Sequence, residues 1–376
     1  MSKKKKFWII FVSVFVVIAI VIVAIVLIKK LKKNDTANSE EATTEAAESE
    51  KKEPRPSTNG LEFELNEDGK SYICTGFGTC TETNIVIDLY NNLPVTAISR
   101  GAFGKNDTIA SVELGDFVET IGEFSFSGCK NLGSVSFGEG LKIIEDYAFG
   151  ACKKLDSIVI PDKVTDICFG AFEGCESIKS VKLGRSVKNI GNGAFLKCTN
   201  LETVNFPDSL RFIDTSAFGY CENLSVIALP DKIENLGDSP FFGTAYYNDP
   251  ENWEEDGSFY IGAYLFAAPK DLEEYYKIKE GTRVIASHAF TNQEKLKSIV
   301  IPDGVVGISN GAFTFCGNLQ SVVIPKSVRL FYMNPFMFCD SLTDIYYTGS
   351  EREWGKIDKE YFNPVGVNIH FNSKPQ

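Results

Sequence analysis

The chain has 376 residues, with 38 lysines and arginines against 50 aspartates and glutamates, and a formal net charge of −12. The first 33 residues hold eight of the lysines and no acid, so the remainder carries 30 basic against 50 acidic side chains. Nucleic-acid binding rests on basic side chains that neutralise phosphates. The composition therefore argues against a DNA-binding or RNA-binding role.

The first predicted element is an apolar segment that begins at Phe7 and ends at Ile28. Its 22 residues include no charge, and a helix of that length, at about 1.5 Å per residue, spans a hydrocarbon core of about 30 Å. A cleavable signal peptide has a shorter apolar region and a small-residue cleavage site, whereas this segment runs straight into Lys29 and Lys30. We predict that residues 1–33 are a basic cytoplasmic end and an uncleaved transmembrane signal anchor.

The orientation of this anchor is not decided by charge, because four lysines flank the span on each side. The long C-terminal region must lie on one side of the membrane, and we place it outside the cell, with the N-terminus inside. The reverse topology, with a cytoplasmic C-terminal region, is the alternative. Residues 34–59 contain no Val, Ile, Leu or aromatic residue and are rich in Glu, Thr and Ala, which predicts a disordered acidic stalk.

An internal repeat organises the rest of the chain. An Ala-Phe slot recurs every 23 residues, is disturbed once by a gap of 49 residues, and then resumes with the same spacing. A second motif, LxxΦxΦ with Φ apolar, keeps this period, as in "LDSIVI" from Leu155 and "LKSIVI" from Leu296. Its alternating end predicts a short strand, and because one such strand cannot bury its apolar face alone, neighbouring turns must stack. The Ala-Phe slots begin at Ala102, Ser125, Ala148, Ala171, Ala194, Ala217, Pro240, Ala289, Ala312 and Pro335.

These patterns predict one elongated, right-handed solenoid of about eleven turns over residues 60–376. A further apolar row, which includes Ile144 and Ile167, predicts a second inward position in each turn. The LxxΦxΦ strands should form one parallel ladder about 50 Å long, at about 4.8 Å per strand. We expect an N-terminal cap turn at 60–98, an irregular insertion at 244–282, and a C-terminal cap at 343–376 in which Trp354 covers the last turn.

The 23-residue unit AFxxCxxLxxVxIPxxVxxI resembles the BspA-like leucine-rich repeat family of bacterial surface proteins. The opening "LEFELNEDGKSYICTGFGTC" resembles the family's first turn, and "IYYTGSEREWGKI" resembles a frequent closing unit. The resemblance implies a leucine-rich-repeat solenoid with short parallel β-strands and irregular or helical returns, here preceded by one transmembrane helix. It specifies no ligand, because relatives range from adhesins for host glycoproteins to proteins of no assigned role.

Cysteine occupies one slot of the repeat, three residues after the Phe. Stacked positions spread along the axis cannot supply four ligands to one zinc ion, and every member has the same geometry, which disfavours disulfides. We predict buried free thiols in a small apolar slot, in a reducing or anaerobic setting. Cys74 and Cys80 are the only pair that we consider for a disulfide bond. The slot holds Cys129, Cys152, Cys175, Cys198, Cys221, Cys316 and Cys339.

No catalytic constellation is recognisable in the sequence. The chain has two histidines, His288 and His370, and neither has an evident catalytic partner. No phosphate-cradling glycine motif, nucleophile elbow or HExxH motif occurs, and no pattern singles out a pair of carboxylates for glycoside hydrolysis. We therefore expect a protein that is not an enzyme and that holds neither a metal nor a cofactor.

One candidate partner-binding site is a row of outward strand positions. Val300, Val323 and Tyr346 fall on consecutive predicted strands, 23 residues apart. They should touch one another and form a small, solvent-exposed apolar strip on an acidic domain. Such strips with a tyrosine at one edge are favoured interaction sites.

A second candidate is the irregular insertion, which concentrates aromatic residues that include Tyr246, Tyr247 and Trp253. These rings either stack on sugars or pack on one another as a local plug, and we favour packing. The leading functional hypothesis is a membrane-anchored adhesion or binding module, with a monomeric ectodomain that recognises a host or bacterial surface protein. The alternatives are a structural scaffold of the envelope and, less favoured, a glycan-binding or cell-wall-acting protein.

Overall fold

The computed structural model describes residues 53–359, 362 and 366–373. The expected transmembrane segment from Phe7 to Ile28 and residues 34–52 of the expected stalk lie outside these residues. The prediction that a disordered stalk runs to residue 59 is wrong, because the backbone N–H groups of Ser57 and Thr58 donate to the carbonyl oxygens of Leu89 and Val86. In the part of the chain that is described, no helix combines the length and the apolar character needed to cross a membrane. Residues from Pro54 onward form the unit that contains every described strand.

Each turn of the repeat contributes a strand to the predicted apolar row. These strands pair in parallel from turn to turn, so that Ile167 lies opposite both Ile144 and Ile190. The isoleucines are buried, because they point from the strand into the space that the turn encloses. The sheet comprises β1 (Glu62–Leu65), β2 (Tyr72–Gly76), β4 (Leu89–Tyr90), β5 (Leu93–Ile98), β7 (Thr120–Ile121), β9 (Ile143–Ile144), β11 (Asp166–Ile167), β13 (Asn189–Ile190), β15 (Phe212–Ile213) and β16 (Asn235–Leu236).

The LxxΦxΦ motif forms the second set of strands. In β10, Ile158 is buried while Ser157 and Val159 are exposed, which is the alternation of a strand with one buried face. Before residue 236 these strands form two three-stranded sheets, and the motif around Val226 forms no strand. The prediction of one uninterrupted ladder is therefore wrong. The strands are β3 (Asn84–Ile87), β6 (Ser111–Leu114), β8 (Ser134–Ser136), β10 (Ser157–Val159), β12 (Ser180–Lys182) and β14 (Thr203–Asn205).

The insertion opens a second stack of turns. It contains α2 (Ala245–Asn248), the 3-10 helix η1 (Pro250–Asn252) and an antiparallel hairpin of β17 and β18, and β18 then pairs in parallel with β20. Because β2 and β18 also serve as rungs, the solenoid has about 13 turns, more than predicted. The strands of the second stack are β17 (Phe259–Ile261), β18 (Tyr264–Ala267), β19 (Tyr275–Lys277), β20 (Val284–Ile285), β21 (Ser298–Val300), β22 (Gly307–Ile308), β23 (Ser321–Ile324), β24 (Leu330–Phe331), β25 (Asp344–Tyr347) and β26 (Asn368–Phe371).

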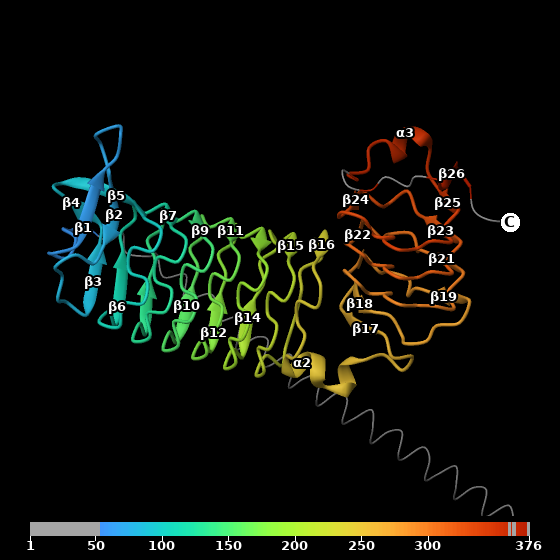
Figure 1. Ribbon diagram of the computed structural model, residues 1–376, viewed down its shortest axis with the longest axis horizontal. Coiled ribbons are helices and arrows are strands. Elements are labelled where there is room, and N and C mark those ends of the chain that lie inside the picture. The colour runs from blue at the N-terminus through green and yellow to red at the C-terminus, as the bar shows by residue number, and fades with distance from the viewer. Residues whose placement is uncertain (1–52, 360–361, 363–365, 374–376) are drawn as a thin grey trace, which may run out of the picture. The chain divides into compact units, whose positions relative to one another are not determined.

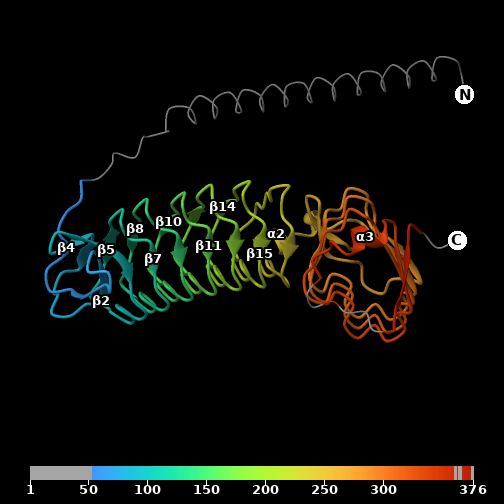
Figure 2. The same ribbon diagram turned by 90° about the horizontal axis from the view of Figure 1, so that it is seen from above.

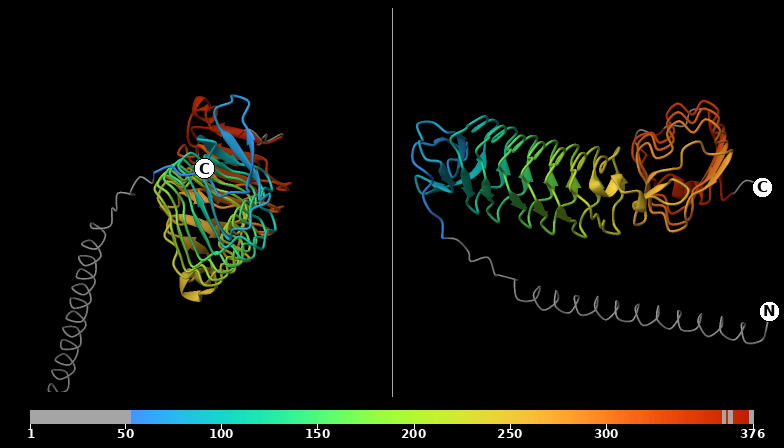
Figure 3. Two further views of the ribbon diagram at one scale, coloured as in Figure 1. Left: turned by 90° about the vertical axis from the view of Figure 1, so that its left-hand side faces the viewer. Right: turned by 90° about the horizontal axis from the view of Figure 1, so that it is seen from below.

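The two stacks meet where β16 ends the first one (Figure 1). At this edge the backbone N–H of Leu236 donates to Ser309 Oγ at 3.3 Å, and its carbonyl oxygen accepts from both the N–H and the hydroxyl of Ser287. Backbone groups that would otherwise receive another strand are therefore satisfied by loops of the second stack. Figure 2 shows the turns from β5 to β15 side by side in chain order, and Figure 3 shows the first part of the insertion, in yellow, between the stacks.

The phenylalanines of the Ala-Phe slots form the centre of the core. In the first stack, successive ring centroids from Phe103 to Phe241 lie 4.9 to 5.5 Å apart, with ring planes within 9° of parallel. Phe290, Phe313 and Phe336 repeat this arrangement in the second stack. The distance between successive rings is close to the strand spacing of about 4.8 Å, so each turn adds one ring to the core and one strand to the ladder.

The prediction that the ladder cysteines are buried free thiols is confirmed. Each thiol also donates a hydrogen bond to the carbonyl oxygen of the Phe that lies 26 residues earlier, as Cys175 does to Phe149 at 3.1 Å. Burial raises the pKa of Cys129 to about 12. Cys74 and Cys80, the pair considered for a disulfide, are both buried free thiols.

The C-terminal end of the second stack is covered by Trp354, as the sequence predicted. This residue ends α3 (Glu351–Trp354), is 7% exposed, and packs against the rings of Phe331 and Tyr347. Ser350 begins the helix with a capping box, because its side chain and that of Glu353 each bond to the other's backbone N–H.

Candidate binding surfaces

The predicted apolar strip lies on the outward face of the second stack. Val300 pairs with Val323, and Val323 pairs with Tyr346, on the adjacent parallel strands β21, β23 and β25. The row continues on β26, where His370 lies opposite Tyr346 and stacks on its ring at 4.7 Å. The sequence therefore predicted the register of this row correctly.

The predicted exposure of Val323 is wrong, because this side chain is only 4% exposed whereas Val300 is 51% exposed. Val323 points outward, but the larger Tyr346 lies in direct register on one side and Val300 on the other, about 4.8 Å away. The strip is consequently a small packed cluster. Val300 and part of Tyr346 are exposed to solvent, and Val323 lies buried between them.

A hydrogen-bonded carboxylate and imidazole border this cluster. The Nε2 atom of His370 lies 2.7 Å from Oδ1 of Asp344, and Thr343 donates to the other carboxylate oxygen of Asp344 at 2.8 Å. The hydrogen bond from His370 lowers the pKa of Asp344 below its ordinary value. The edge next to Tyr346 therefore combines an aromatic surface with an anionic hydrogen-bond acceptor.

Tyr275 extends the same face and was missed by the sequence analysis. It is 72% exposed on β19, where Tyr276 takes the inward slot and Lys277 lies opposite Val300. The leucine of the LxxΦxΦ motif is displaced here, so the motif did not predict this strand. Counting back 23 residues from Ser298, which pairs with Tyr275, would have found it.

The aromatic residues of the insertion pack on one another, as the sequence analysis favoured. Trp253 lies 5.3 Å from Tyr247 and 4.9 Å from Phe259, and its indole N–H donates to the carbonyl oxygen of Tyr247 at 2.8 Å. Tyr246 also contacts Phe259, and burial raises the pKa of Tyr246 and of Tyr247 above the ordinary value. These rings form the end plug of the first stack.

A second exposed aromatic feature was not predicted. Phe315 and Phe338 lie on consecutive turns of the second stack, with ring centroids 4.7 Å apart and exposures of 51% and 59%. Both have positive φ, at the position where other turns have Gly128, Gly174 or Asn292. Bulky side chains are uncommon at such φ values. The sequence signal is an aromatic residue directly before the ladder cysteine, which periodicity alone assigns to a turn.

A pocket of about 370 Å³ lies beside the plug and involves one of the two histidines. Its lining includes Tyr247, Asp238 and His288. The Nδ1 atom of His288 lies 3.5 Å from Oδ2 of Asp238. This arrangement pairs an imidazole with a carboxylate but brings no nucleophile into hydrogen-bond reach of the imidazole among the lining residues.

Comparison with known proteins gives a family match over most of the chain. Residues 71–179, 96–221, 142–249 and 259–369 match the model of the family described as BspA type leucine rich repeat region (6 copies). None of the curated proteins matches the chain.

Solved structures of bacterial repeat proteins are also similar. A leucine rich cell surface protein from Faecalibacterium prausnitzii is 25% identical, covers 81% of this chain and 97% of its own, and has a TM-score of 0.47. The leucine rich repeat protein of T. pallidum is 29% identical, covers 52% of this chain and 90% of its own, and has a TM-score of 0.46. The pneumococcal vaccine antigen PcpA is 18% identical, covers 84% of this chain and 93% of its own, and has a TM-score of 0.36.

Proposed function

Because the chain belongs to the BspA-type leucine-rich repeat family, we propose that it is a bacterial cell-surface module that binds a protein partner, from a host or from another bacterial surface. The segment from Phe7 to Ile28 anchors it in the plasma membrane, and residues 34–52 hold the solenoid outside the cell. The ectodomain acts as a monomer, and its role is binding rather than catalysis.

The observation that carries the proposal is the exposure of Tyr275 and Val300 on one outward face. They lie on the neighbouring strands β19 and β21, and Tyr346 is partly exposed two strands beyond Val300. Exposed apolar groups on a polar surface favour protein association, and tyrosine is a frequent anchor at interfaces. Because Tyr276 and Ile299 fix the same strands to the core, the face is rigid and little entropy is lost on binding.

A protein partner fits this face better than a sugar does. Tyr275 on β19 and the partly exposed Tyr346 on β25 have two strands between them, so they do not form the continuous aromatic platform on which a sugar stacks. Tyr246, Tyr247 and Trp253 of the insertion pack on Phe259 or on one another and so do not offer such a platform.

The test uses the full chain in detergent to capture partners from a host-matrix extract and from a bacterial membrane fraction. Val300→Glu should reduce capture of the partner at least tenfold, because a carboxylate would replace an apolar contact in an acidic surface. Val159→Glu is the matched control, since β10 has the same Ser-Ile-Val sequence and Val159 is 61% exposed.

Equal capture by the wild type and Val300→Glu would exclude this face, and the pair Phe315 and Phe338 would become the next candidate. Capture of the same resident membrane protein from every preparation, with no host protein, would favour the envelope-scaffold alternative. Equal loss in Val159→Glu and Val300→Glu would mean that the added charge, not the site, decides capture.

A further inference from the structure

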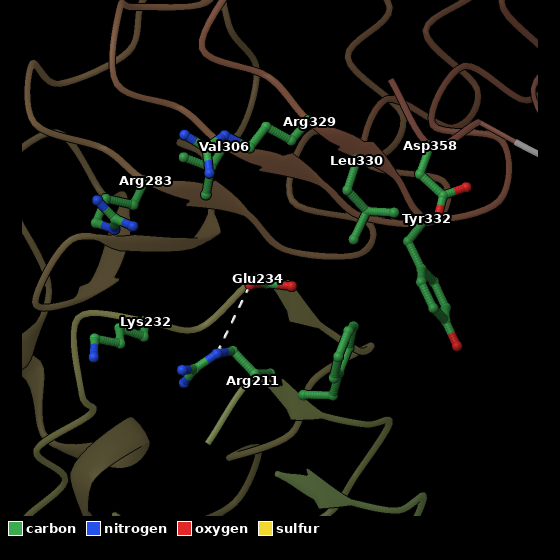
Figure 4. A pocket seen from close by; sticks show the side chains of 10 residues that line it. Arg211, Lys232, Glu234, Arg283, Val306, Arg329, Leu330, Tyr332 and Asp358 are labelled. Carbon is green, nitrogen blue, oxygen red and sulfur yellow. Dashed lines mark ion pairs between the residues drawn. The ribbon is translucent and has the colours of Figure 1, made fainter. Parts of the chain in front are cut away.

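A pocket of about 510 Å³ opens where the two stacks meet. Its walls come from residues just before strands of both stacks: Arg211 precedes β15, Glu234 precedes β16, Arg283 precedes β20 and Arg329 precedes β24. Figure 4 shows these side chains around one space, with Tyr332 and Asp358 at one end. The volume lies in the range of about 300–1,000 Å³ that is usual for small-ligand sites.

The charge of this pocket is opposite to that of the protein. Its lining holds the four basic residues Arg211, Lys232, Arg283 and Arg329 against two carboxylates, on a chain with a net charge of −12. Among the described residues, no carboxylate lies within ion-pair distance of Lys232, Arg283 or Arg329. Like charges repel unless an anion lies between them, so the pocket is electrostatically suited to a negative ligand.

Arg211 is paired within the protein, whereas Arg283 has a buried donor atom without a partner. Arg211 is held by hydrogen bonds from Nη1 to the carbonyl oxygens of Asp208 and Leu210, and its Nε lies 3.8 Å from Glu234. The Nε atom of Arg283 is buried and has no hydrogen-bond partner. A buried, unsatisfied charged donor is costly, and a carboxylate or sulfate ligand would satisfy it.

The other residues that line the pocket favour a ligand that has hydroxyl groups and a ring in addition to an anionic group. Phe212, Leu330 and Tyr332 supply apolar and aromatic surface, against which the C–H face of a sugar ring can pack. Glu234 and Asp358 supply carboxylate oxygens that accept hydrogen bonds from hydroxyl groups. Cations for one acidic group, acceptors for hydroxyls and a ring surface occur together in this pocket.

From this combination we propose that the pocket binds an acidic saccharide unit, a sugar ring that carries a carboxylate or a sulfate. Arg283 and Arg329 hold the anionic group, the carboxylates accept the hydroxyl hydrogens, and the ring lies against Tyr332. This site is separate from the strand face around Val300 and does not depend on the protein partner proposed above.

The experiment measures binding to the full chain in detergent at low ionic strength, by titration calorimetry. The probes are D-glucuronate and D-glucose, which differ in one carboxylate, together with inorganic sulfate and a triglutamate peptide. Arg329→Gln is the main variant because Arg329 is exposed, so that folding is preserved. Lys188→Gln is the matched control: this exposed lysine occupies the same repeat slot, two residues before Ile190, but lies outside the pocket.

Glucuronate should bind at least tenfold more tightly than glucose, Arg329→Gln should weaken it about tenfold, and Lys188→Gln should leave its affinity within about twofold. Tyr332→Ala should weaken glucuronate more than sulfate, since only the sugar uses the ring. Sulfate binding as tightly as glucuronate, tighter binding of triglutamate, or no binding by any probe would each overturn the proposal.

Discussion

The thiol of Cys175 donates a hydrogen bond to the carbonyl oxygen of Phe149 on the preceding turn, at 3.1 Å. That oxygen also accepts from the backbone N–H of Cys152 at 3.2 Å, so each ladder thiol is an additional link between neighbouring turns. The cysteines are therefore both small core residues and donors.

Cys175→Ala should lower the free energy of unfolding by about 1 to 2 kcal/mol, because it removes this bond and leaves a small cavity. Urea unfolding followed by circular dichroism measures the effect. Cys168→Ala is the control, since Cys168 lies outside the ladder and is only partly buried, and it should change the value by less than about 0.5 kcal/mol. An equal loss in both variants would contradict a special role for the ladder.

Alkaline pH should destabilise the solenoid through the buried thiols. The folded-state pKa of Cys129 is raised to about 12, whereas a thiol in the unfolded chain ionises near pH 9. The contribution of this thiol to stability is therefore complete below about pH 9 and is lost as pH rises toward 12, by up to about 1.4 kcal/mol per pH unit. Unfolding measured at pH 8, 9.5 and 10.5 should show a shallower decline for Cys129→Ala than for the wild type. Identical slopes would contradict the raised pKa.

Val323→Glu should destabilise the second stack although Val323 points outward. The side chain is 4% exposed, so a carboxylate there is desolvated or must be protonated, at a cost of about 2 to 4 kcal/mol. Val300→Glu, on the next strand at 51% exposure, should cost less than about 0.5 kcal/mol. Thermal unfolding of the two variants gives the comparison, and equal midpoints would mean that Val323 is accessible after all.

The sequence predicted those structural features that recur every 23 residues. The inward row of Ile144 and Ile167, the thiol ladder and the register of Val300 with Val323 all depend on contacts between neighbouring turns, which the period specifies. The burial of Val323 was not predicted, because alternation gives the direction of a side chain, whereas its exposure depends on the size of Tyr346 beside it.

The 23-residue period could not predict the junction between the two stacks, for a different reason. Leu236 bonds to Ser309, 73 residues away, and no repeat rule states where one stack stops and another begins. Arg211, Arg283 and Arg329 occupy the same slot, two residues before the apolar row, and this was readable in the sequence. That they line one pocket follows only from the way the insertion brings the second stack against Glu234.

The junction itself can be tested at Gly307, the first residue of β22. A Cβ atom built on Gly307 would lie 2.1 Å from the carbonyl oxygen of Glu234, and neither backbone can move without disturbing its own sheet. Gly307→Ala should therefore lower the free energy of unfolding by about 2 to 4 kcal/mol. Gly317→Ala is the matched control, because no atom lies within 4 Å of its added Cβ and its φ is not positive.

Urea unfolding of Gly307→Ala shows whether the two stacks still unfold in one transition. If the stacks are held together by the contact between Gly307 and Glu234, the variant should show two separate transitions or increased protease cleavage near residue 250, while Gly317→Ala behaves as the wild type. Because Val306 and Glu234 line the basic pocket, the same variant should also lose glucuronate binding. A Gly307→Ala protein with unchanged stability and one cooperative transition would show that the stacks do not pack through this contact.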